Sequence, residues 1–416
     1  MHAIRFKTLR GNAIYYTLDN RIELSNVFGA AKEFDLSFEA SASFIHSRIE
    51  KFVVELTQQC TLRCSYCCYS GQYEGMRSHS PLSMSEETLK KTIEFIGEHC
   101  NKEAEKVHVN LYGGEALICF DKVEFLVSEL RRRLGGLVQF SISTNGLALT
   151  PAIVDWICSV PNVQVMVSVD GDKEMHDACR KTIQGKGSYD QIVANLLSFK
   201  DKYPKEYQER VAILATLRKI EDAEMLSDRW RTTPLSDKLP IIISLVSPNF
   251  SNGELFLPRL SDLAAYYKKA FAQYVRGEKT LMTRSLQTLV DTIKNRDFEL
   301  CQGEHTIYSC LNDMHRCYID TNGTLYACEK VCMEQSVGNL WSGFDQQRMR
   351  NLTFRYVERL NRLCSQCWAV RLCPKCMVTL NYSEDEQRQL CEIERGKALL
   401  ALKYYCLVQD LNASRC

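Results

Sequence analysis

Three closely spaced cysteines form the part of the sequence best suited to chemistry. The segment reads Cys60-Thr-Leu-Arg-Cys64-Ser-Tyr-Cys67 and directly follows a run of strand-forming residues. Three thiolates at this spacing can ligate three irons of a cubane iron–sulfur cluster, which leaves the fourth iron open for a substrate or cosubstrate. Cys68 is a disfavoured fourth ligand, because we expect its side chain to point away from the other three. Zinc is the alternative metal, although zinc prefers four ligands in two separated pairs.

A second group of cysteines occupies the last part of the chain. Of the 20 cysteines, twelve fall between positions 301 and 416, whereas four lie between 69 and 300. The N-terminus has no apolar secretory signal, so we expect a cytoplasmic protein whose reduced thiols bind metal rather than form disulfides. The pairs Cys364-x2-Cys367 and Cys373-x2-Cys376 would also suit a short zinc ribbon.

The composition is that of a globular protein, and it gives no reason to expect nucleic acid or a membrane as a partner. The 416 residues suggest two or three domains, and 45% hydrophobic with 25% charged residues is typical of a globular chain. The 52 basic and 51 acidic residues give a net charge of +1, which offers no general attraction to nucleic acid or to an anionic membrane. No charge-free apolar run reaches the roughly 18 residues of a membrane span.

Strand-like and helix-like segments alternate between residues 51 and 247. This alternation predicts an α/β fold with a parallel sheet, either an open sheet or a partial barrel, with functional residues where the strands end. Residues 1–50 contain a predicted hairpin of Ile4–Leu9 and Ala13–Leu18, and residues 251–300 read as helices. The predicted strands are Phe52–Leu56, Val107–Tyr112, Val138–Ser143, Val163–Val169, Val211–Leu217 and Pro240–Val246.

The first cysteine segment resembles that of the radical S-adenosylmethionine (SAM) superfamily. The sequence Gly113-Gly114-Glu115 after the second predicted strand is similar to the family's Gly-Gly-Glu motif, with Ala116 in place of the usual proline. The resemblance implies a partial (β/α)6 TIM-like barrel over residues 51–250, in which the glutamate binds the SAM amino group and Arg180 binds its carboxylate. The SAM-binding residues implied are Tyr66, Gly113, Gly114, Glu115, Ser143, Asn145, Ser168, Asp170 and Arg180.

The later cysteines resemble the SPASM extension of some radical SAM enzymes, which holds two auxiliary [4Fe–4S] clusters. This implies a cysteine-rich iron–sulfur domain over residues 301–416, preceded by a small β-rich segment at 1–50 and a helical connector at 251–300. Two residues, rather than the family's usual three, separate Cys373 from Cys376. By position, auxiliary cluster I would use Cys310, Cys317, Cys328 and Cys376, with Cys301 or Cys332 as substitutes for Cys317. Auxiliary cluster II would use Cys364, Cys367, Cys373 and Cys391.

The resemblance implies an oxidoreductase that uses SAM and three [4Fe–4S] clusters. Reductive cleavage of SAM would give a 5′-deoxyadenosyl radical that abstracts a hydrogen atom from a peptide or protein, which would carry a leader sequence. A flavodoxin or ferredoxin would donate the electron, and no general base is assigned. We expect thioether crosslinking of a cysteine-containing ribosomal peptide. The alternatives are a sulfatase-type maturase that oxidises Cys or Ser to formylglycine, a carbon–carbon cyclase or epimerase, and a zinc-stabilised binding protein.

Overall fold

The structure is a computed structural model, which describes most of the chain. The described residues are 3–8, 11–17, 20–24, 37–39, 48–219, 222–235, 239–245, 257–295, 305–306, 315–374 and 376–415. Cys301, Cys310 and Cys416 lie outside them, so the predicted ligand role of Cys310 has no structural counterpart here.

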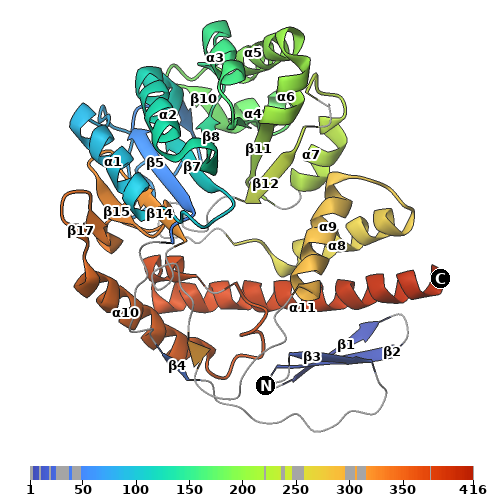
Figure 1. The fold of residues 1–416 in the computed structure, drawn as a ribbon. Coiled ribbons are helices and arrows are strands. Elements are labelled where there is room, and N and C mark those ends of the chain that lie inside the picture. The colour runs from blue at the N-terminus through green and yellow to red at the C-terminus, as the bar shows by residue number, and fades with distance from the viewer. Residues whose placement is uncertain are drawn as a thin grey trace.

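Six parallel strands, in sequence order across the sheet, form the centre of the fold (Figure 1). The α/β class with a central parallel sheet is therefore confirmed. The strands are β5 (Lys51–Thr57), β7 (Val107–Gly113), β8 (Val138–Thr144), β9 (Val163–Ser168), β11 (Val211–Leu217) and β12 (Ile241–Leu245).

Helices connect these strands and cover the sheet's outer face (Figure 1). Helix α1 begins after Ser85, whose side chain accepts a hydrogen bond from the backbone N–H of Thr88 at 3.0 Å, as an N-cap residue does. The helices are α1 (Glu86–His99), α2 (Phe120–Leu134), α3 (Pro151–Ser159), α4 (Lys173–Cys179), α5 (Tyr189–Lys202), α6 (Pro204–Arg210) and α7 (Asp222–Trp230), with short 3₁₀ turns η1 (Ala116–Cys119) and η2 (Gly135–Leu137).

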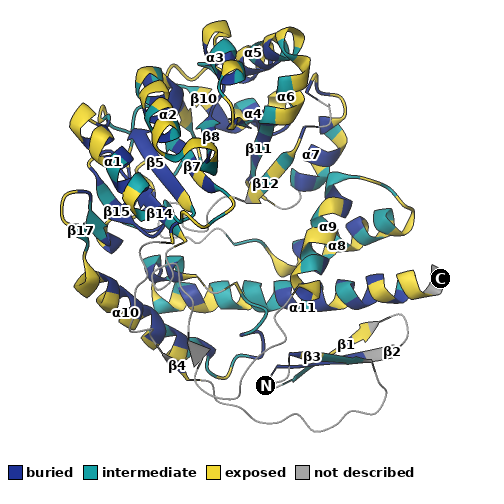
Figure 2. Ribbon diagram, in the orientation of Figure 1, coloured by how far each residue is buried: buried dark blue, intermediate teal, exposed yellow. Residues whose placement is uncertain are grey.

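The strands alternate between two kinds of environment. In β8, Val138, Phe140 and Ile142 are fully buried, whereas the residues between them are half-buried. Because successive side chains point to opposite faces of a strand, one face packs in the apolar core and the other is free to carry polar residues. Figure 2 shows the buried sheet beneath helices that are exposed on their outer sides.

The C-terminal part of the chain extends the same sheet. Strand β14 (Arg316–Ile319) pairs in parallel with β5, and β15 (Thr324–Tyr326), β16 (Gly338–Asn339) and β17 (Gly343–Phe344) continue antiparallel. The long helix α11 (Glu384–Arg415) crosses below the sheet (Figure 1). The remaining elements are β6 (Leu62–Cys64), β10 (Arg180–Thr182), α8 (Leu260–Val275), α9 (Leu281–Lys294), β13 (His305–Thr306), η3 (Met333–Gln335), α10 (Gln346–Cys364) and η4 (Met377–Asn381).

The N-terminal residues form a small sheet that packs against α11 on the side away from the main sheet (Figure 1). Strands β1 (Ala3–Thr8) and β2 (Gly11–Tyr16) make the predicted hairpin, and β3 (Arg21–Leu24) pairs with β2, whereas β4 (Phe38–Glu39) pairs with β13. Tyr15 packs with Trp368 and Leu402, and the Thr17 hydroxyl donates to the Trp368 carbonyl at 2.9 Å. The small sheet thus supports the segment between Cys367 and Cys373.

None of the described helices is long and apolar enough to cross a membrane.

Candidate active site

A cavity of about 870 Å³ opens at the carboxyl ends of the parallel strands. Residues of the polar strand faces line it, including Tyr112 of β7, Ser143 of β8, Ser168 of β9 and Thr216 of β11. The opposite wall comes from η4 and from Lys397 of α11. The cavity therefore lies between the sheet and the C-terminal part of the chain, where parallel α/β folds usually hold their ligands.

The three cysteines of the first segment all line this cavity. Strand β6 pairs antiparallel with β10, which sets Cys64 opposite Arg180. The Leu62 N–H donates to the sulfur of Cys60, and the Tyr69 N–H donates to that of Cys67, each at 3.4 Å. Burial raises the pKa of the Cys60 thiol, and it raises that of Cys64 to about 11. Thiolates at these positions therefore need a positively charged partner, which metal ligation provides.

The donor set fits an iron–sulfur cluster better than a single zinc ion. Three cysteines from one loop line a cavity that also has room for a ligand. Within the described ranges, no three His, Cys, Asp or Glu side chains are grouped around one point as the ligands of a single ion would be. A [4Fe–4S] cubane has four irons at alternate corners and each cysteine ligates a different iron, so the ligands are spread around a larger volume.

The expected orientation of Cys68 was wrong. Cys68 also lines the cavity, and its sulfur lies 3.8 Å from the hydroxyl of Tyr112, another residue of the cavity lining. The tight turn in which the Cys67 N–H donates to the Cys64 carbonyl at 3.1 Å brings neighbouring side chains to the same side.

Gly113 and Gly114 let the end of β7 lie directly against the start of the cysteine loop. A Cβ at Gly113 would be 2.2 Å from the Thr57 carbonyl oxygen, and one at Gly114 would be 2.2 Å from that of Gln59. The backbone of Gly114 donates to Thr57 at 2.8 Å. Only glycine permits this approach, so both residues fix the position of the loop as well as lining the cavity.

Glu115 lies behind the cavity wall rather than on it. Its carboxylate accepts hydrogen bonds from the Thr144 hydroxyl at 2.7 Å, the Asn145 N–H at 2.7 Å and the Leu117 N–H at 3.1 Å. Burial raises its pKa, and these hydrogen bonds oppose that effect. Glu115 therefore ties the end of β7 to the end of β8, where Asn145 lines the cavity.

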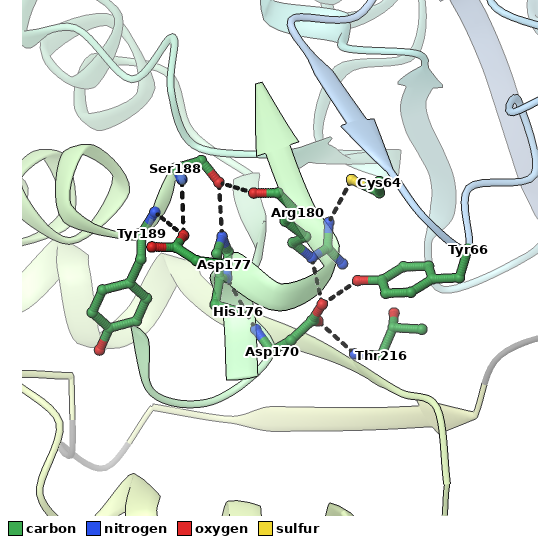
Figure 3. Close-up of polar contacts among 9 residues, drawn as sticks. All are labelled: Cys64, Tyr66, Asp170, His176, Asp177, Arg180, Ser188, Tyr189 and Thr216. Atoms are coloured by element: carbon green, nitrogen blue, oxygen red, sulfur yellow. Dashed lines mark hydrogen bonds and ion pairs between the residues drawn. The ribbon is translucent and has the colours of Figure 1, made fainter. Parts of the chain in front are cut away.

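Asp170 joins four parts of the site (Figure 3). One carboxylate oxygen accepts from Arg180 Nε at 2.7 Å and from the Tyr66 hydroxyl, and the other accepts from the Thr216 N–H at 2.8 Å. The Arg180 guanidinium also lies 4.0 Å from the Cys64 sulfur and 5.3 Å from the centre of the Tyr66 ring. Tyr66 and Arg180 line the cavity, so Asp170 orients both from behind.

A neutral histidine supports Asp170 in turn. His176 Nδ1 accepts from the Asp170 N–H at 3.3 Å, and its Nε2 lies 2.9 Å from the Ser188 hydroxyl (Figure 3). Burial lowers the pKa of His176 to about 4, so the ring is neutral near pH 7 and carries its proton on Nε2. The Ser188 hydroxyl then donates to the Arg180 carbonyl at 2.8 Å, which completes the link.

Some of the later cysteines lie close together. Burial raises the pKa of Cys328 to about 11, with negative charge on Glu329 and then on Cys376 adding to the effect. Burial likewise raises the pKa of Cys391 on α11, and Cys367 contributes through its charge. Each pair was predicted to share a cluster. At the end of α10, the Cys367 N–H donates to the Cys364 carbonyl at 3.0 Å, so these two cysteines share one turn. Cys373 belongs to the following turn of the chain.

Cys317 and Cys332 have different surroundings. Cys317 is fully buried in the apolar core of the sheet, where burial raises its pKa and where it pairs in register with Phe52. Cys332 is half-buried, and its sulfur lies 3.1 Å from the side-chain oxygen of Asn381 in η4, which begins just after Cys376.

Several residues that line the cavity were not predicted from the sequence. They come from the ends of β11 and β12, from the start of α8 and from the C-terminal part, and no motif marks them. Charged members of this set are Arg218, Lys219, Arg259, Asp262, Glu329, Lys330 and Lys397.

We predict that Gly114→Ala displaces the cysteine loop. The added methyl group would collide with backbone, so we expect a loss of about 1–3 kcal/mol in the free energy of unfolding and less iron per chain after anaerobic reconstitution. Gly136→Ala is the matched control, because its added Cβ meets nothing within 4 Å. Unchanged iron binding and stability in Gly114→Ala would contradict this prediction.

We predict that Asp170→Asn strongly destabilises the protein. Arg180 is 8% exposed, and removing its partner leaves a buried charge unpaired, at a cost of about 3–5 kcal/mol. Urea unfolding under anaerobic conditions measures the effect. Asp155→Asn removes an exposed ion pair with Lys202 and should have a much smaller effect; similar losses in the two variants would refute the role given to Asp170.

Comparisons with known proteins agree with this geometry. Residues 54–227 match the model of the radical SAM superfamily. The serine-type anaerobic sulfatase-maturating enzyme of Bacteroides thetaiotaomicron is 31% identical over 140 residues, which cover 33% of this chain and 33% of the relative. The match thus spans about a third of that curated relative.

Two solved structures share the fold over most of the chain. Native anSMEcpe with bound AdoMet has a TM-score of 0.64 at 17% identity and covers 87% of this chain and 99% of its own. Streptococcus suis SuiB bound to the precursor peptide SuiA has a TM-score of 0.54 at 12% identity and covers 91% of this chain and 95% of its own. The sheet, the cavity at its carboxyl edge and the family match together identify residues 54–227 as a radical SAM domain.

Proposed function

We propose that this protein is a radical SAM peptide maturase. Cys60, Cys64 and Cys67 would hold a [4Fe–4S] cluster, and the observation that carries the proposal is that all three cysteines line one cavity together with strand-end residues. A bound cluster and SAM supply one-electron cleavage of a carbon–sulfur bond and a 5′-deoxyadenosyl radical that accepts a hydrogen atom. An external flavodoxin or ferredoxin would supply the electron, and we place the protein in the reducing cytoplasm.

The chain's own residues would bind and orient SAM. Tyr66, Ser143 and Ser168 face the cavity and would contact it directly, as would the backbone of Gly113 and Gly114 and the side chain of Asn145. Arg180 would bind the carboxylate through the nitrogens that Asp170 does not use. Glu115 and Asp170 would act through their neighbours, because their carboxylates are occupied by hydrogen bonds.

We propose two auxiliary [4Fe–4S] clusters in the C-terminal part. One would use Cys310, Cys328 and Cys376, and the other Cys364, Cys367, Cys373 and Cys391. The apolar surroundings of Cys317 favour Cys301 or Cys332 as the fourth ligand of the first cluster. Cys328 directly precedes Glu329, which lines the cavity, so this cluster would lie close enough to exchange electrons with a bound substrate.

We further propose that the reaction is thioether crosslinking of a cysteine-containing peptide. A cavity carboxylate, Glu329 or Asp262, would accept the thiol proton, and the cavity would hold the peptide with a carbon-bound hydrogen within reach of the 5′-deoxyadenosyl radical. Formation of the carbon–sulfur bond would release one electron, which the auxiliary clusters would take up and return to the donor. The peptide would lose two hydrogen atoms and SAM would give methionine and 5′-deoxyadenosine, so each turnover would consume one SAM and no net electron. Support for a peptide substrate comes from the shared fold with SuiB, which has been solved bound to a precursor peptide.

The test uses the full chain reconstituted anaerobically with iron and sulfide. We expect about twelve iron atoms per chain and about four fewer in the Cys60→Ala/Cys64→Ala/Cys67→Ala variant, which should form no 5′-deoxyadenosine. Cys158→Ala is the control, because Cys158 is outside every proposed ligand set. With SAM, a reductant and a short cysteine-containing peptide, taken from the neighbouring genes where one is found there, mass spectrometry should find a peptide lighter by two hydrogen atoms with its thiol blocked to alkylation.

Other outcomes separate the alternatives. An aldehyde that reacts with a hydrazide reagent would instead support the sulfatase-type reaction, which the match to a sulfatase-maturating enzyme favours. A lighter peptide with a free thiol would indicate a carbon–carbon crosslink, and an unchanged mass with an inverted residue would indicate an epimerase. Bound zinc without iron would overturn the proposed function as a whole.

A further inference from the structure

Among the described residues, four cationic side chains of the cavity lining are exposed to solvent. They line the same cavity as the cysteine loop, and we call them the cationic rim: Arg218, Lys219, Arg259 and Lys330. Arg218 and Lys219 follow β11, whereas Arg259 precedes α8 and Lys330 follows Cys328. Three separate parts of the chain therefore bring positive charge to one opening.

Within the part of the chain that the structure describes, no ion pair neutralises the rim charges. None of the four side chains has an ion-pair partner among the residues that the structure describes. The other two cations of the cavity are paired, Arg180 with Asp170 at 2.7 Å and Lys397 with Glu394 at 2.7 Å. The chain as a whole carries a net charge of only +1, whereas the described lining of this cavity has an excess of positive charge.

Unpaired charge of one sign around a cavity attracts ligands of the opposite sign. Low-dielectric walls focus the field at such an opening and raise the local concentration of the ligand. Of the two acidic residues that line the cavity, Glu329 is already paired with Arg316 at 2.5 Å. Among the described residues of the cavity lining, Asp262 is then the one carboxylate left to offset the four rim charges.

We propose that the cationic rim binds an acidic segment of the peptide substrate and so guides the peptide into the cavity. The proposal rests on the proposed function and adds to it the charge of the substrate. Carboxylates spaced along a peptide match cations that come from separate elements. A nucleotide phosphate group is a poorer match, because phosphates usually bind where backbone N–H groups of one glycine-rich loop converge. The Gly113–Gly114 backbone, the glycine pair in the cavity wall, is packed against Thr57 and Gln59 instead.

The test measures binding rather than turnover. Three fluorescently labelled peptides of equal length and one cysteine each, with Glu, Gln or Lys at the same alternate positions, are titrated with the reconstituted full chain and followed by fluorescence anisotropy. At low ionic strength we expect the Glu peptide to bind at least roughly fourfold more tightly than the Gln peptide, since each of four exposed ion pairs contributes a factor of about 1.4 to 5. High salt should remove the difference.

Variants identify the residues responsible. Lys219→Gln/Lys330→Gln should weaken binding of the Glu peptide by roughly 2- to 25-fold and leave the Gln peptide unaffected. Lys102→Gln/Lys205→Gln removes the same charge from exposed positions outside the cavity and should leave the preference intact. Thermal unfolding of both variants shows whether they are folded.

Three results would overturn the inference. The first is equal binding of the three peptides, and the second is an equal loss of the preference for the Glu peptide in both double variants. The third is displacement of the labelled Glu peptide by GTP at a lower concentration than by unlabelled Glu peptide, which would indicate a phosphate site. Formation of 5′-deoxyadenosine by the same preparation tests the proposed function separately, so each can fail without the other.

Discussion

Two buried carboxylates hold together the edge of the sheet on which the cavity opens. Glu115 joins the ends of β7 and β8, and Asp170 joins the end of β9 to β10, β11 and the cysteine loop. A buried carboxylate is costly unless hydrogen bonds and an opposite charge compensate it. Glu115 and Asp170 both receive hydrogen bonds from the backbone or side chains of neighbouring strands. The compensation of each buried carboxylate therefore depends on those strands keeping their relative positions. The cysteines, Arg180 and Asn145 are in turn positioned by this edge.

The pleat of the strands explains how one sheet serves both the core and the site. Residues such as Val109 and Phe140 are buried in the core, and the alternate residues of the same strands, such as Tyr112 and Ser143, line the cavity. A shift of one residue in register would exchange the two sets. The glycine pair at the end of β7 adds a second constraint, because it holds the cysteine loop in backbone contact with this edge.

Much of the fold was predictable from local sequence. Short runs rich in Val and Ile, separated by amphipathic segments, indicated each of the six parallel strands, and Ser85 marked the start of a helix. The first cysteine loop was predictable because its ligands are close in sequence. The pairing of β14 with β5, and the contact of the N-terminal sheet with Trp368, join segments hundreds of residues apart and have no local signal.

The same distinction applies to the site. The hydrogen bonds of the Glu115 carboxylate depend on how close two strand ends lie, which the sequence does not show. The motif alone therefore favoured a direct contact between Glu115 and SAM. The orientation of Cys68 depends on a tight turn, and the cationic rim depends on three loops meeting. Such features arise from packing between elements rather than from any motif, and only a structure brings them together.

The central claim is that the loop of Cys60, Cys64 and Cys67 provides a site at which SAM binds an iron directly. Electron paramagnetic resonance of the reduced, reconstituted chain tests it most directly, with spectra recorded with and without SAM. We expect SAM to change one cluster signal, and we expect the Cys60→Ala/Cys64→Ala/Cys67→Ala variant to lack this signal but retain the others. A spectrum that SAM leaves unchanged, or a SAM-dependent change that persists in the variant, would contradict it.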